Sequence, residues 1–211
     1  MSMLRGLYLI TDETLTPYER IEEYLIPAFE GGTRILQLRD KHLDDEALFP
    51  VAERIQALCR EFGVTFIIND RIDLANELNA DGLHIGRDDE GYELARRILG
   101  RKKIIGVSCY GDLFRAKEME HKGADYVAFG SFFTSSTKPQ APTISSSLMG
   151  EAKRMIRIPV CGIGGITAEN ASLLANQGAD MLAVISDVWC APDIKARCEL
   201  LSGLFHGTPA L

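Results

Sequence analysis

The sequence predicts an α/β fold, a single (β/α)8 barrel of the TIM type, on three observations. Short β-rich apolar runs alternate with amphipathic segments along the 211 residues, which is typical of repeated β-α units and a parallel sheet. Eight such runs occur, and a helix-like segment follows nearly every one. An Ala-Asp step introduces a strand three times, at Ala80-Asp81, Ala124-Asp125 and Ala179-Asp180. A chain of this length favours one domain over residues 1–211.

Each predicted strand is a short run bounded by polar residues or glycine. In order, the runs are 6–11, 34–38, 64–68, 82–85, 103–107, 126–130, 159–163 and 181–185. Helical spacing with charged residues between the apolar ones is clearest in the first two connections, at Ile21, Leu25, Ala28 and Phe29, and then at Leu48, Ala52, Ile55, Leu58 and Phe62. Gly123 and Gly178, ahead of two Ala-Asp steps, fit helix C-caps. An open doubly wound sheet is the alternative, but no G-x-G-x-x-G follows the first run.

Composition and charge exclude several classes of function. With 46% apolar and 25% charged residues, the composition is that of an ordinary globular protein. A net charge of −7 gives no electrostatic attraction to nucleic acid or to an anionic membrane. The longest run without a charged residue is 12, too short to span a bilayer, and no export signal is visible. Five cysteines without a C-x-x-C pair indicate reduced thiols in a cytoplasmic protein.

Polar residues cluster where the second predicted strand ends. Because side chains alternate along a strand, Gln37, Arg39 and Lys41 point one way while Leu38 and Asp40 point the other. Active sites in this fold lie at the carboxyl ends of the strands, so two cations and an amide on one face suit an anionic substrate. A solvated patch of salt bridges is the alternative interpretation.

Carboxylates follow the next two strands. Asn69 and Asp70 end the third, and Asp88 and Asp89 follow the fourth. Carboxylates on adjacent strand ends can share a hard cation, and Mg²⁺ fits better than zinc, since His84 has no Cys or second His at useful spacing. We expect His84 to fill a layer of the barrel. Asp88 also has the alternative role of a helix N-cap.

Ser108 offers a hydroxyl at the end of the fifth strand. None of the four histidines, His42, His84, His121 and His206, is expected on a strand end opposite it with an orienting acid. A nucleophilic triad is therefore not predicted, and Ser108 is interpreted as a hydrogen-bond donor.

The last strand ends favour phosphate. The polar segment 134–147 follows the sixth strand, suggests a lid or a solvated connector, and carries Ser135, Thr137 and Lys138, a second anion contact. Gly164-Gly165 follows the seventh strand, and Ile185 and Ser186 follow the eighth, the usual place for a phosphate in such barrels. A tight packing turn is the alternative for the glycines. Two separated anion sites result, one sized for a diphosphate with a metal and one for a monophosphate.

With these residues in place, the chain from Gly6 to about Val188 resembles the thiamine-phosphate synthase family. Ten motifs carry the resemblance in order: Tyr8-Leu-Ile-Thr-Asp12, Gln37-x-Arg39-Asp-Lys41, Ile68-Asn-Asp70, Asp81-Gly-x-His84-x-Gly86-x-x-Asp89, Gly106-Val-Ser108, Gly123-Ala-Asp-Tyr-Val127, Phe129-Gly-Ser131, Ser135-x-Thr137-Lys138, Gly162-Ile-Gly-Gly-Ile166 and Ala183-Val-Ile-Ser186. Each motif alone is weak, and the ordered set is specific.

The resemblance implies a transferase of thiamine biosynthesis that joins a hydroxymethylpyrimidine diphosphate to a hydroxyethylthiazole phosphate and releases pyrophosphate. It implies that the pyrimidine diphosphate is bound by Gln37, Arg39, Lys41, Asn69, Ser108 and Lys138. It implies that Mg²⁺ is held by Asp70 and Asp89, and that the thiazole phosphate is bound by Ser135, Thr137, Gly165, Ile185 and Ser186. Breaking the diphosphate C–O bond first needs no protein nucleophile, so Arg39, Lys41 and Lys138 would stabilise the leaving group.

Three other functions compete with this one. A sister family with the same barrel isomerises the thiazole phosphate, but it has no use for the diphosphate and metal residues. A non-catalytic phosphate sensor would have no reason to keep the metal pair, and a sugar-phosphate barrel enzyme would need an isolated acid and base. The sequence departs from the family at Tyr110, Arg87 and Ser135, where His, Gln and Thr are common. The apolar stretch Leu200, Leu201, Leu204 and Phe205 could pack a homodimer or close the last helix on the barrel.

Overall fold

The computed structural model describes residues 4–86, 91–134 and 142–205. In these residues eight strands close into a barrel in sequence order, and every neighbouring pair is parallel. The strands are β1 (Gly6–Ile10), β2 (Ile35–Leu38), β3 (Thr65–Asn69), β4 (Gly82–Ile85), β5 (Ile104–Tyr110), β6 (Tyr126–Phe129), β7 (Val160–Ile163) and β8 (Met181–Val184). The predicted (β/α)8 barrel is therefore confirmed.

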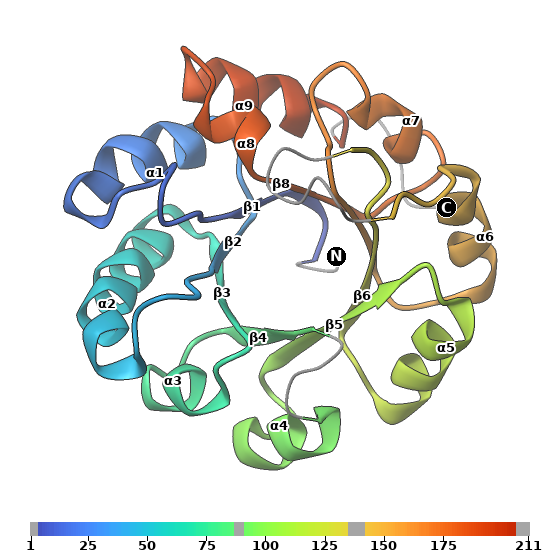
Figure 1. The fold of residues 1–211 in the computed structure, drawn as a ribbon, viewed down its shortest axis with the longest axis horizontal. Coiled ribbons are helices and arrows are strands. Elements are labelled where there is room, and N and C mark those ends of the chain that lie inside the picture. Colours follow the sequence, from blue (N-terminus) through green and yellow to red (C-terminus); the bar gives the residue numbers. More distant parts are fainter. Residues whose placement is uncertain (1–3, 87–90, 135–141, 206–211) are drawn as a thin grey trace.

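Helices surround the strands as an outer ring (Figure 1). They are η1 (Tyr18–Arg20), α1 (Ile21–Glu30), α2 (Asp45–Phe62), α3 (Ile72–Glu77), α4 (Tyr92–Leu99), α5 (Leu113–Lys122), α6 (Ser147–Met155), α7 (Ala171–Ala175), α8 (Ser186–Trp189) and α9 (Ile194–Gly203). The predicted inward face of the first connection is confirmed, since Ile21, Leu25, Ala28 and Phe29 of α1 are buried. In α2 the predicted residues Leu48, Ala52 and Ile55 are buried, and Leu58 and Phe62 are partly buried against the core. None of the described helices is both long and apolar enough to cross a membrane.

Local sequence fixes where the longer helices begin and end. The carboxylates of Asp44, Asp112 and Asp193 accept hydrogen bonds from backbone N–H groups in the first turns of α2, α5 and α9, groups that would otherwise lack partners. Gly63 and Gly123 end α2 and α5 in the left-handed conformation that glycine adopts without strain. The C-cap role expected of Gly123 is thus confirmed. Gly178 is not the C-cap of a helix, because α7 ends at Ala175 and Gly178 lies in the turn that follows it.

The strand boundaries differ from the prediction by at most one residue at either end, except in β5. The predicted strand ends at residue 107, but β5 continues through Ser108 to Tyr110, with a register shift against β6 between these two residues. Tyr110 has a positive φ of 56°. The extension places Ser108 inside the strand rather than on the rim beyond it, and the half-buried side chain faces the barrel interior.

Two apolar layers hold the barrel together. The larger lies between the strands and the helices, and the smaller fills the barrel interior, with Tyr8, Ile35, Ile67, Tyr126 and Met181 among its members. Filling the interior with side chains makes the barrel a packed core rather than a channel. Truncating a fully buried aliphatic side chain in such a core costs about 2 to 5 kcal/mol of stability.

The repeated Ala-Asp step has a structural reason. The carboxylates of Asp81, Asp125 and Asp180, one at the start of each of β4, β6 and β8, accept hydrogen bonds from backbone N–H groups at the start of the strand before. The donors are Phe66 at 2.9 Å, Ile105 at 2.8 Å and Val160 at 2.8 Å. Each of these bonds gives a partner to a backbone donor at the amino end of β3, β5 or β7.

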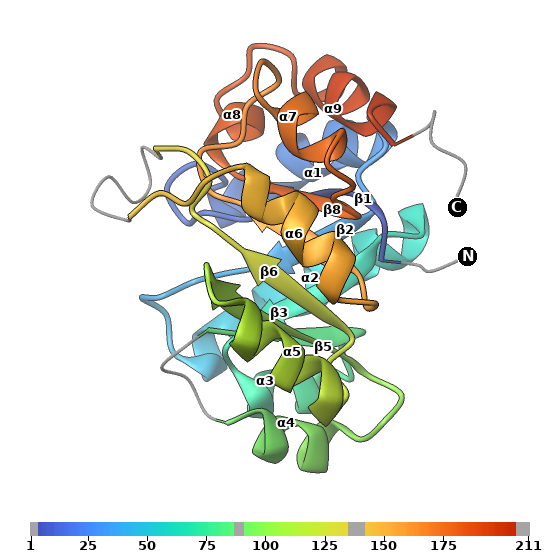
Figure 2. The ribbon, with the colours of Figure 1, turned by 90° about the vertical axis from the view of Figure 1, so that its right-hand side faces the viewer.

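The other end of the barrel carries the strand-end loops. Figure 2 shows the loop after β2, in light blue, and the chain on either side of residues 135–141, in yellow, projecting from the same end. The carboxyl ends of the strands therefore form the face on which the predicted site lies.

Candidate active site

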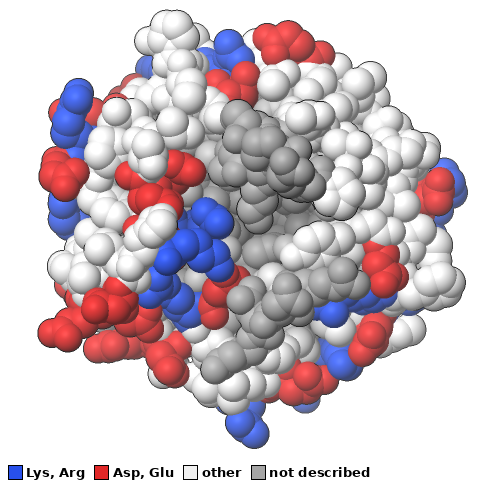
Figure 3. All heavy atoms as spheres, in the orientation of Figure 1, with Lys and Arg blue, Asp and Glu red and all other residues white. Residues whose placement is uncertain are grey.

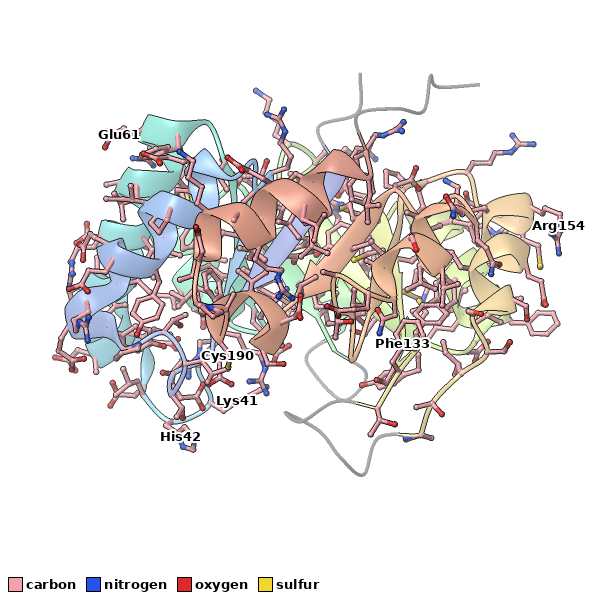
Figure 4. The ribbon with its side chains drawn as sticks, turned by 90° about the horizontal axis from the view of Figure 1, so that it is seen from above. Lys41, His42, Glu61, Phe133, Arg154 and Cys190 are labelled. Carbon is pink, nitrogen blue, oxygen red and sulfur yellow. The ribbon has the colours of Figure 1, made fainter. Side chains whose placement is uncertain are left out.

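Three predicted site residues and the histidine expected in the barrel interior come from four consecutive strands. Gln37, Asn69 and Ser108 lie on β2, β3 and β5, and β4 contributes His84, which is paired in register with Asn69. Gln37 and Asn69 are buried, with exposed fractions of 2% and 9%. Figure 4 shows Lys41 from the loop after β2, and Cys190 at the end of α8, at this end of the barrel, whereas Glu61 lies at the other. The closed parallel barrel thus gathers residues that are far apart in the sequence.

The loop after β2 is held by the carboxylate of Asp40. One oxygen accepts hydrogen bonds from the backbone N–H groups of His42 and Leu43, both at 2.7 Å, and the other accepts one from the hydroxyl of Tyr18 at 2.7 Å. Arg71 donates to the carbonyls of Asp40 and Leu43, at 3.0 and 2.5 Å. Burial raises the pKa of Asp40, but the three hydrogen bonds outweigh it and leave the pKa lowered. Asp40 is therefore a structural anion.

This loop presents the two predicted cations. The ammonium group of Lys41 pairs with the carboxylate of Asp70 at the end of β3. The half-buried Arg39 forms no ion pair with any residue in the described ranges, and its backbone N–H donates to Thr11 Oγ1 at 3.0 Å. Lys and Arg side chains gather over β2 and β3, next to acidic ones (Figure 3). The arrangement fits an anion that enters over these two strands.

Asp70 sits in an unusual backbone conformation. Its φ is 61°, the left-handed region that non-glycine residues rarely adopt, and its N–H donates to the carbonyl of His84 at 2.9 Å. The side-chain amide of Asn69 donates to Asp70 Oδ2 at 2.6 Å. Such strained residues cluster at functional sites, where their surroundings hold them in place. Here β4, Asn69 and Lys41 together fix one carboxylate at the barrel mouth.

The donor chemistry at Asp70 fits Mg²⁺. This cation is usually held by one or two carboxylates, with water and phosphate oxygens completing its octahedron. Asp70 supplies a hard oxygen ligand beside the anion-binding cations. Within the described residues no group of three or more His, Cys, Asp or Glu side chains could hold a metal, and the second predicted ligand, Asp89, lies outside them.

A chain of buried hydrogen bonds runs beneath the mouth, from Gln37 to Ser108. Gln37 Nε2 lies 2.6 Å from the hydroxyl of Tyr8, which lies 2.9 Å from the hydroxyl of Tyr126. That hydroxyl lies 2.8 Å from Nδ1 of His84, and Nε2 of the same ring lies 2.9 Å from Oγ of Ser108. The His84 and Tyr126 rings also stack, with centroids 5.6 Å apart. Two predicted substrate contacts are therefore physically linked.

This chain contains a contact that the sequence did not predict. His84 is hydrogen-bonded to Ser108, because β5 continues past the predicted end and carries Ser108 alongside β4. The expected place of His84 in the barrel interior is correct. Burial lowers the pKa of His84 to about 4, and Nδ1 faces a phenol rather than a carboxylate. No orienting acid is present at Nδ1, so these contacts do not form a nucleophilic triad.

Across the mouth, Gly164 and Gly165 form the turn after β7. Their φ values are 98° and 60°, and neither donates its backbone N–H to another residue in the described ranges. A Cβ on Gly165 would lie 2.4 Å from the carbonyl oxygen of Thr134. A Cβ on Gly164 would likewise collide with Ser131. Glycine is required here because the chain leaving β6 packs against the turn.

Side chains lock this turn to the end of β8. Asn170 donates to the carbonyl of Gly165 at 2.9 Å and accepts from the N–H of Thr167 at 2.9 Å. Asp187 accepts from the N–H of Ala168 at 3.1 Å and pairs with Arg197 of α9 at 2.6 Å. These bonds hold the turn in front of Ile185 and Ser186, both half-buried at the start of α8.

Several predicted residues lie outside the described ranges. They are the metal ligand Asp89 and the loop residues Ser135, Thr137 and Lys138, together with Arg87 and Asp88. The chain that leads into the loop is described: the N–H of Phe133 donates to the carbonyl of Gly164 at 3.0 Å, and that of Ile144 to Ser131 at 2.8 Å. The polar loop thus begins and ends beside the glycine turn.

Sequence reasoning missed the residues that support the site. Tyr8 and Tyr126 stand in predicted strands, but only the barrel geometry brings their hydroxyls together. Asp40 could have been recognised, since an Asp whose carboxylate binds the N–H groups two and three residues later is a common turn motif. Asn170 and Asp187 had no comparable local pattern.

Comparisons with known proteins agree on one family. Residues 7–188 match the family model described as thiamine monophosphate synthase. The chain is 45% identical to the thiamine-phosphate synthase of Thiobacillus denitrificans, over 97% of this chain and 96% of that one, and 47% identical to that of Wolinella succinogenes, over 92% and 90%. Among solved structures, thiamine phosphate pyrophosphorylase from Pyrococcus furiosus superposes with a TM-score of 0.87 at 35% identity, covering 96% of each chain.

Proposed function

Since this chain belongs to the thiamine monophosphate synthase family of transferases, we propose how its residues divide the work of the reaction. The substrates we propose are 4-amino-2-methyl-5-(diphosphooxymethyl)pyrimidine and 4-methyl-5-(2-phosphooxyethyl)thiazole. The bond between the pyrimidine methylene and the diphosphate oxygen breaks, and both electrons leave with pyrophosphate. The thiazole nitrogen then gives its lone pair to the methylene cation, which forms thiamine phosphate.

The cations at the mouth stabilise the leaving group in this proposal. Negative charge builds on the departing pyrophosphate as the C–O bond breaks, so pre-aimed cations lower the barrier more than they tighten substrate binding. Arg39 and Lys41 are placed for this on the loop that Asp40 holds, and we assign the same role to Lys138 from the sequence motif. No protein nucleophile is needed, in keeping with Ser108 being hydrogen-bonded to a neutral ring.

The buried polar residues orient the pyrimidine diphosphate. We assign this binding to Gln37, Asn69 and Ser108, whose strands place them on one side of the mouth. Mg²⁺ would be held by Asp70 and Asp89, and when bound it supplies positive charge to the diphosphate oxygens. Asn69 holds the Asp70 carboxylate through one hydrogen bond of 2.6 Å, which fixes its direction.

The glycine turn receives the second substrate. Backbone N–H groups at Gly165, Ile185 and Ser186 would bind the thiazole phosphate, and the hydroxyls of Ser135 and Thr137 would complete the site. Support comes from Gly164 and Gly165, whose N–H groups donate to no other described residue. The two substrates would then lie on opposite sides of one barrel mouth, with the reacting carbon and nitrogen between them.

One observation carries the proposal. Lys41 and Asn69 converge on the carboxylate of Asp70 at the mouth of a closed barrel, so a cation, an amide and a hard oxygen ligand stand together where a metal-bound diphosphate needs them. An isomerase acting on the thiazole phosphate alone has no use for this group.

The test is product formation from both substrates with Mg²⁺ or with EDTA. We compare the wild type with Lys138→Ala and with the matched control Lys195→Ala, whose ammonium pairs with Glu30 on the helical surface. The expected result is metal-dependent release of pyrophosphate together with thiamine phosphate, lowered about 10²- to 10³-fold in Lys138→Ala only. If no coupling occurs at saturating substrates, turnover of the thiazole phosphate alone would favour the isomerase, and binding without turnover a sensor.

Assembly and location stay predictions. The apolar stretch near the end of the chain predicts either a homodimer contact or packing of the last helix on the barrel, and in it Leu200 is 61% exposed on α9 while Leu201 is buried. Sedimentation of the wild type against Leu200→Glu tests the homodimer. A cytoplasmic location rests on the cysteine pattern alone.

A further inference from the structure

The chain of hydrogen bonds beneath the mouth has a built-in direction. Its first member, the side-chain amide nitrogen of Gln37, can only donate, so the hydroxyl of Tyr8 accepts from it. Tyr8 then has one hydrogen to give and one partner left, the hydroxyl of Tyr126. If every buried hydroxyl hydrogen has an acceptor, Tyr8 gives its hydrogen to Tyr126, and Tyr126 gives its own to Nδ1 of His84, which lies 2.8 Å away. Each step follows because a phenol has a single O–H and, in this chain, a single acceptor left for it.

The direction continues through the imidazole. A neutral ring that accepts at Nδ1 carries its hydrogen on Nε2, so His84 donates to Oγ of Ser108. The ring is neutral in this arrangement, since Nδ1 accepts from Tyr126 and so carries no hydrogen of its own, and the residue is buried, with 9% exposed. With a lone pair of Oγ already taken by His84, the hydroxyl hydrogen of Ser108 points away from the chain. Ser108 is half-buried, so that direction leads to the mouth.

We propose that Tyr8, Tyr126 and His84 are positioning residues that fix Ser108 as a hydrogen-bond donor toward the diphosphate side of the mouth. This rests on the proposed function, which assigns Ser108 to the pyrimidine diphosphate. At the other end of the chain Gln37 turns its amide nitrogen inward and forms no hydrogen bond through its amide oxygen within the described residues, so that oxygen is an acceptor suited to the amino group of the same substrate's pyrimidine ring. One continuous chain therefore sets both contacts.

The barrel is shaped to hold this chain. A Cβ at Gly106 would lie 1.9 Å from the Tyr126 ring and 2.4 Å from its hydroxyl oxygen, so only glycine leaves room for the phenol at this place on β5. Tyr8 and Tyr126 are 1% and 0% exposed, and burying a phenolic hydroxyl without a partner is costly. Two phenols and an imidazole in the interior are thus retained as one fully bonded set.

A reversed chain is the competing arrangement. If Gln37 presented its amide oxygen to Tyr8, every bond would run the other way, Nδ1 of His84 would carry the hydrogen, and Ser108 would donate inward to Nε2. Ser108 would then offer only lone pairs to a ligand that is itself an anion. The tautomer of His84 distinguishes the two arrangements.

The first experiment is a double-mutant cycle of Tyr126→Phe and Ser108→Ala, with kcat/KM for the pyrimidine diphosphate as the readout. Tyr126→Phe removes the donor to His84, so the ring can take the other tautomer and draw in the Ser108 hydrogen. We expect kcat/KM to fall about tenfold, the size of one hydrogen bond to a charged group. In the Ser108→Ala background the same change should lower it by less than about twofold, because both act through one contact.

The matched control is Tyr92→Phe. Tyr92 is also a buried tyrosine whose hydroxyl is bonded, at 3.0 Å to Arg96, but it lies on α4 outside the barrel. It should change stability without changing kcat/KM. Equal losses for Tyr126→Phe with and without Ser108 would overturn the inference and leave the proposed function standing. No loss in Ser108→Ala itself, with thiamine phosphate still formed, would overturn the inference together with the assignment of Ser108.

The second experiment takes its readout from the wild-type enzyme. Nitrogen-15 NMR of the histidine-labelled wild-type enzyme at neutral pH reports which ring nitrogen carries the hydrogen, with His84→Gln to assign the signals. We expect His84 as the Nε2–H tautomer, with Nδ1 accepting. An Nδ1–H tautomer in the wild type would overturn the proposed direction of the chain.

Discussion

Lys41 and Asp70 form an ion pair that joins the loop after β2 to the end of β3. The lysine is 48% exposed in its side chain and the aspartate 16%, so the pair sits at the barrel mouth with its anion held more deeply. The cation that we propose for the leaving group and the carboxylate that we propose for Mg²⁺ thus contact each other directly.

We expect Lys41→Met to lose most of its transferase activity. Removing a charge aimed at the leaving group costs about 3 to 4 kcal/mol of barrier, or roughly 10²- to 10³-fold in kcat. Steady-state rates with both substrates measure it, with Lys195→Met as the control for a surface lysine. A higher KM with an unchanged kcat would show that Lys41 binds the substrate but adds no stabilisation that is specific to the transition state.

The same pair predicts opposite effects on metal affinity. Lys41 competes for the Asp70 carboxylate, so Lys41→Met should bind Mn²⁺, a probe for Mg²⁺, several-fold more tightly in the absence of substrate. Asp70→Asn should weaken that binding more than about tenfold, since one carboxylate ligand is lost. Electron paramagnetic resonance titration of free Mn²⁺ gives both constants. Unchanged affinity in Asp70→Asn would remove Asp70 from the metal site.

Asp40→Asn should destabilise the protein in a pH-dependent way. The hydrogen bonds to Asp40 leave its folded pKa below the ordinary 3.8, so its stabilisation is present above that pH and is lost as the pH falls below it. At pH 7 we expect a loss of about 1 to 2 kcal/mol, which lowers Tm by roughly 2 to 8 °C. As the pH falls below 3.8 the gap between variant and wild type should shrink. Asp73→Asn, an exposed residue of α3, controls for the change in net charge.

Gly165→Ala and Gly63→Ala separate crowding from backbone strain. Both glycines have similar positive φ, 60° and 67°, but a Cβ at Gly63 meets nothing within 4 Å, whereas one at Gly165 meets the carbonyls of Phe133 and Thr134. Gly63→Ala should cost about 1 kcal/mol through strain alone. Gly165→Ala should add about 1 to 3 kcal/mol of overpacking and raise KM for the thiazole phosphate. An equal KM for the thiazole phosphate in the two variants would show that the glycine turn does not bind that substrate.

The periodic parts of the fold were open to prediction. Buried residues recur in α1 and α2 with a period set by the helix, and the strand runs are bounded by polar residues, so both can be read within a short window. From strand order, the barrel then places Gln37, Asn69 and Ser108 at one end.

Contacts across the barrel could not be predicted from the sequence. Tyr8 and Tyr126 are 118 positions apart, and His84 and Ser108 belong to strands whose register decides whether they meet. A strand that runs three residues longer than its apolar run, as β5 does, changes such a contact without changing the local pattern. Register is fixed by packing of the whole sheet, which one sequence window does not contain.

The bonds made by Asp81, Asp125 and Asp180 tie β3 to β4, β5 to β6 and β7 to β8, and none of the three links β4 to β5. A division of the chain between β4 and β5 therefore leaves every one of them inside a half. We expect two separately expressed fragments cut there to reassemble into active enzyme more readily than fragments cut between β5 and β6. From β3 to β8 these bonds thus join the strands in pairs, and the boundaries between pairs are the places where the ring can be opened without breaking one of them.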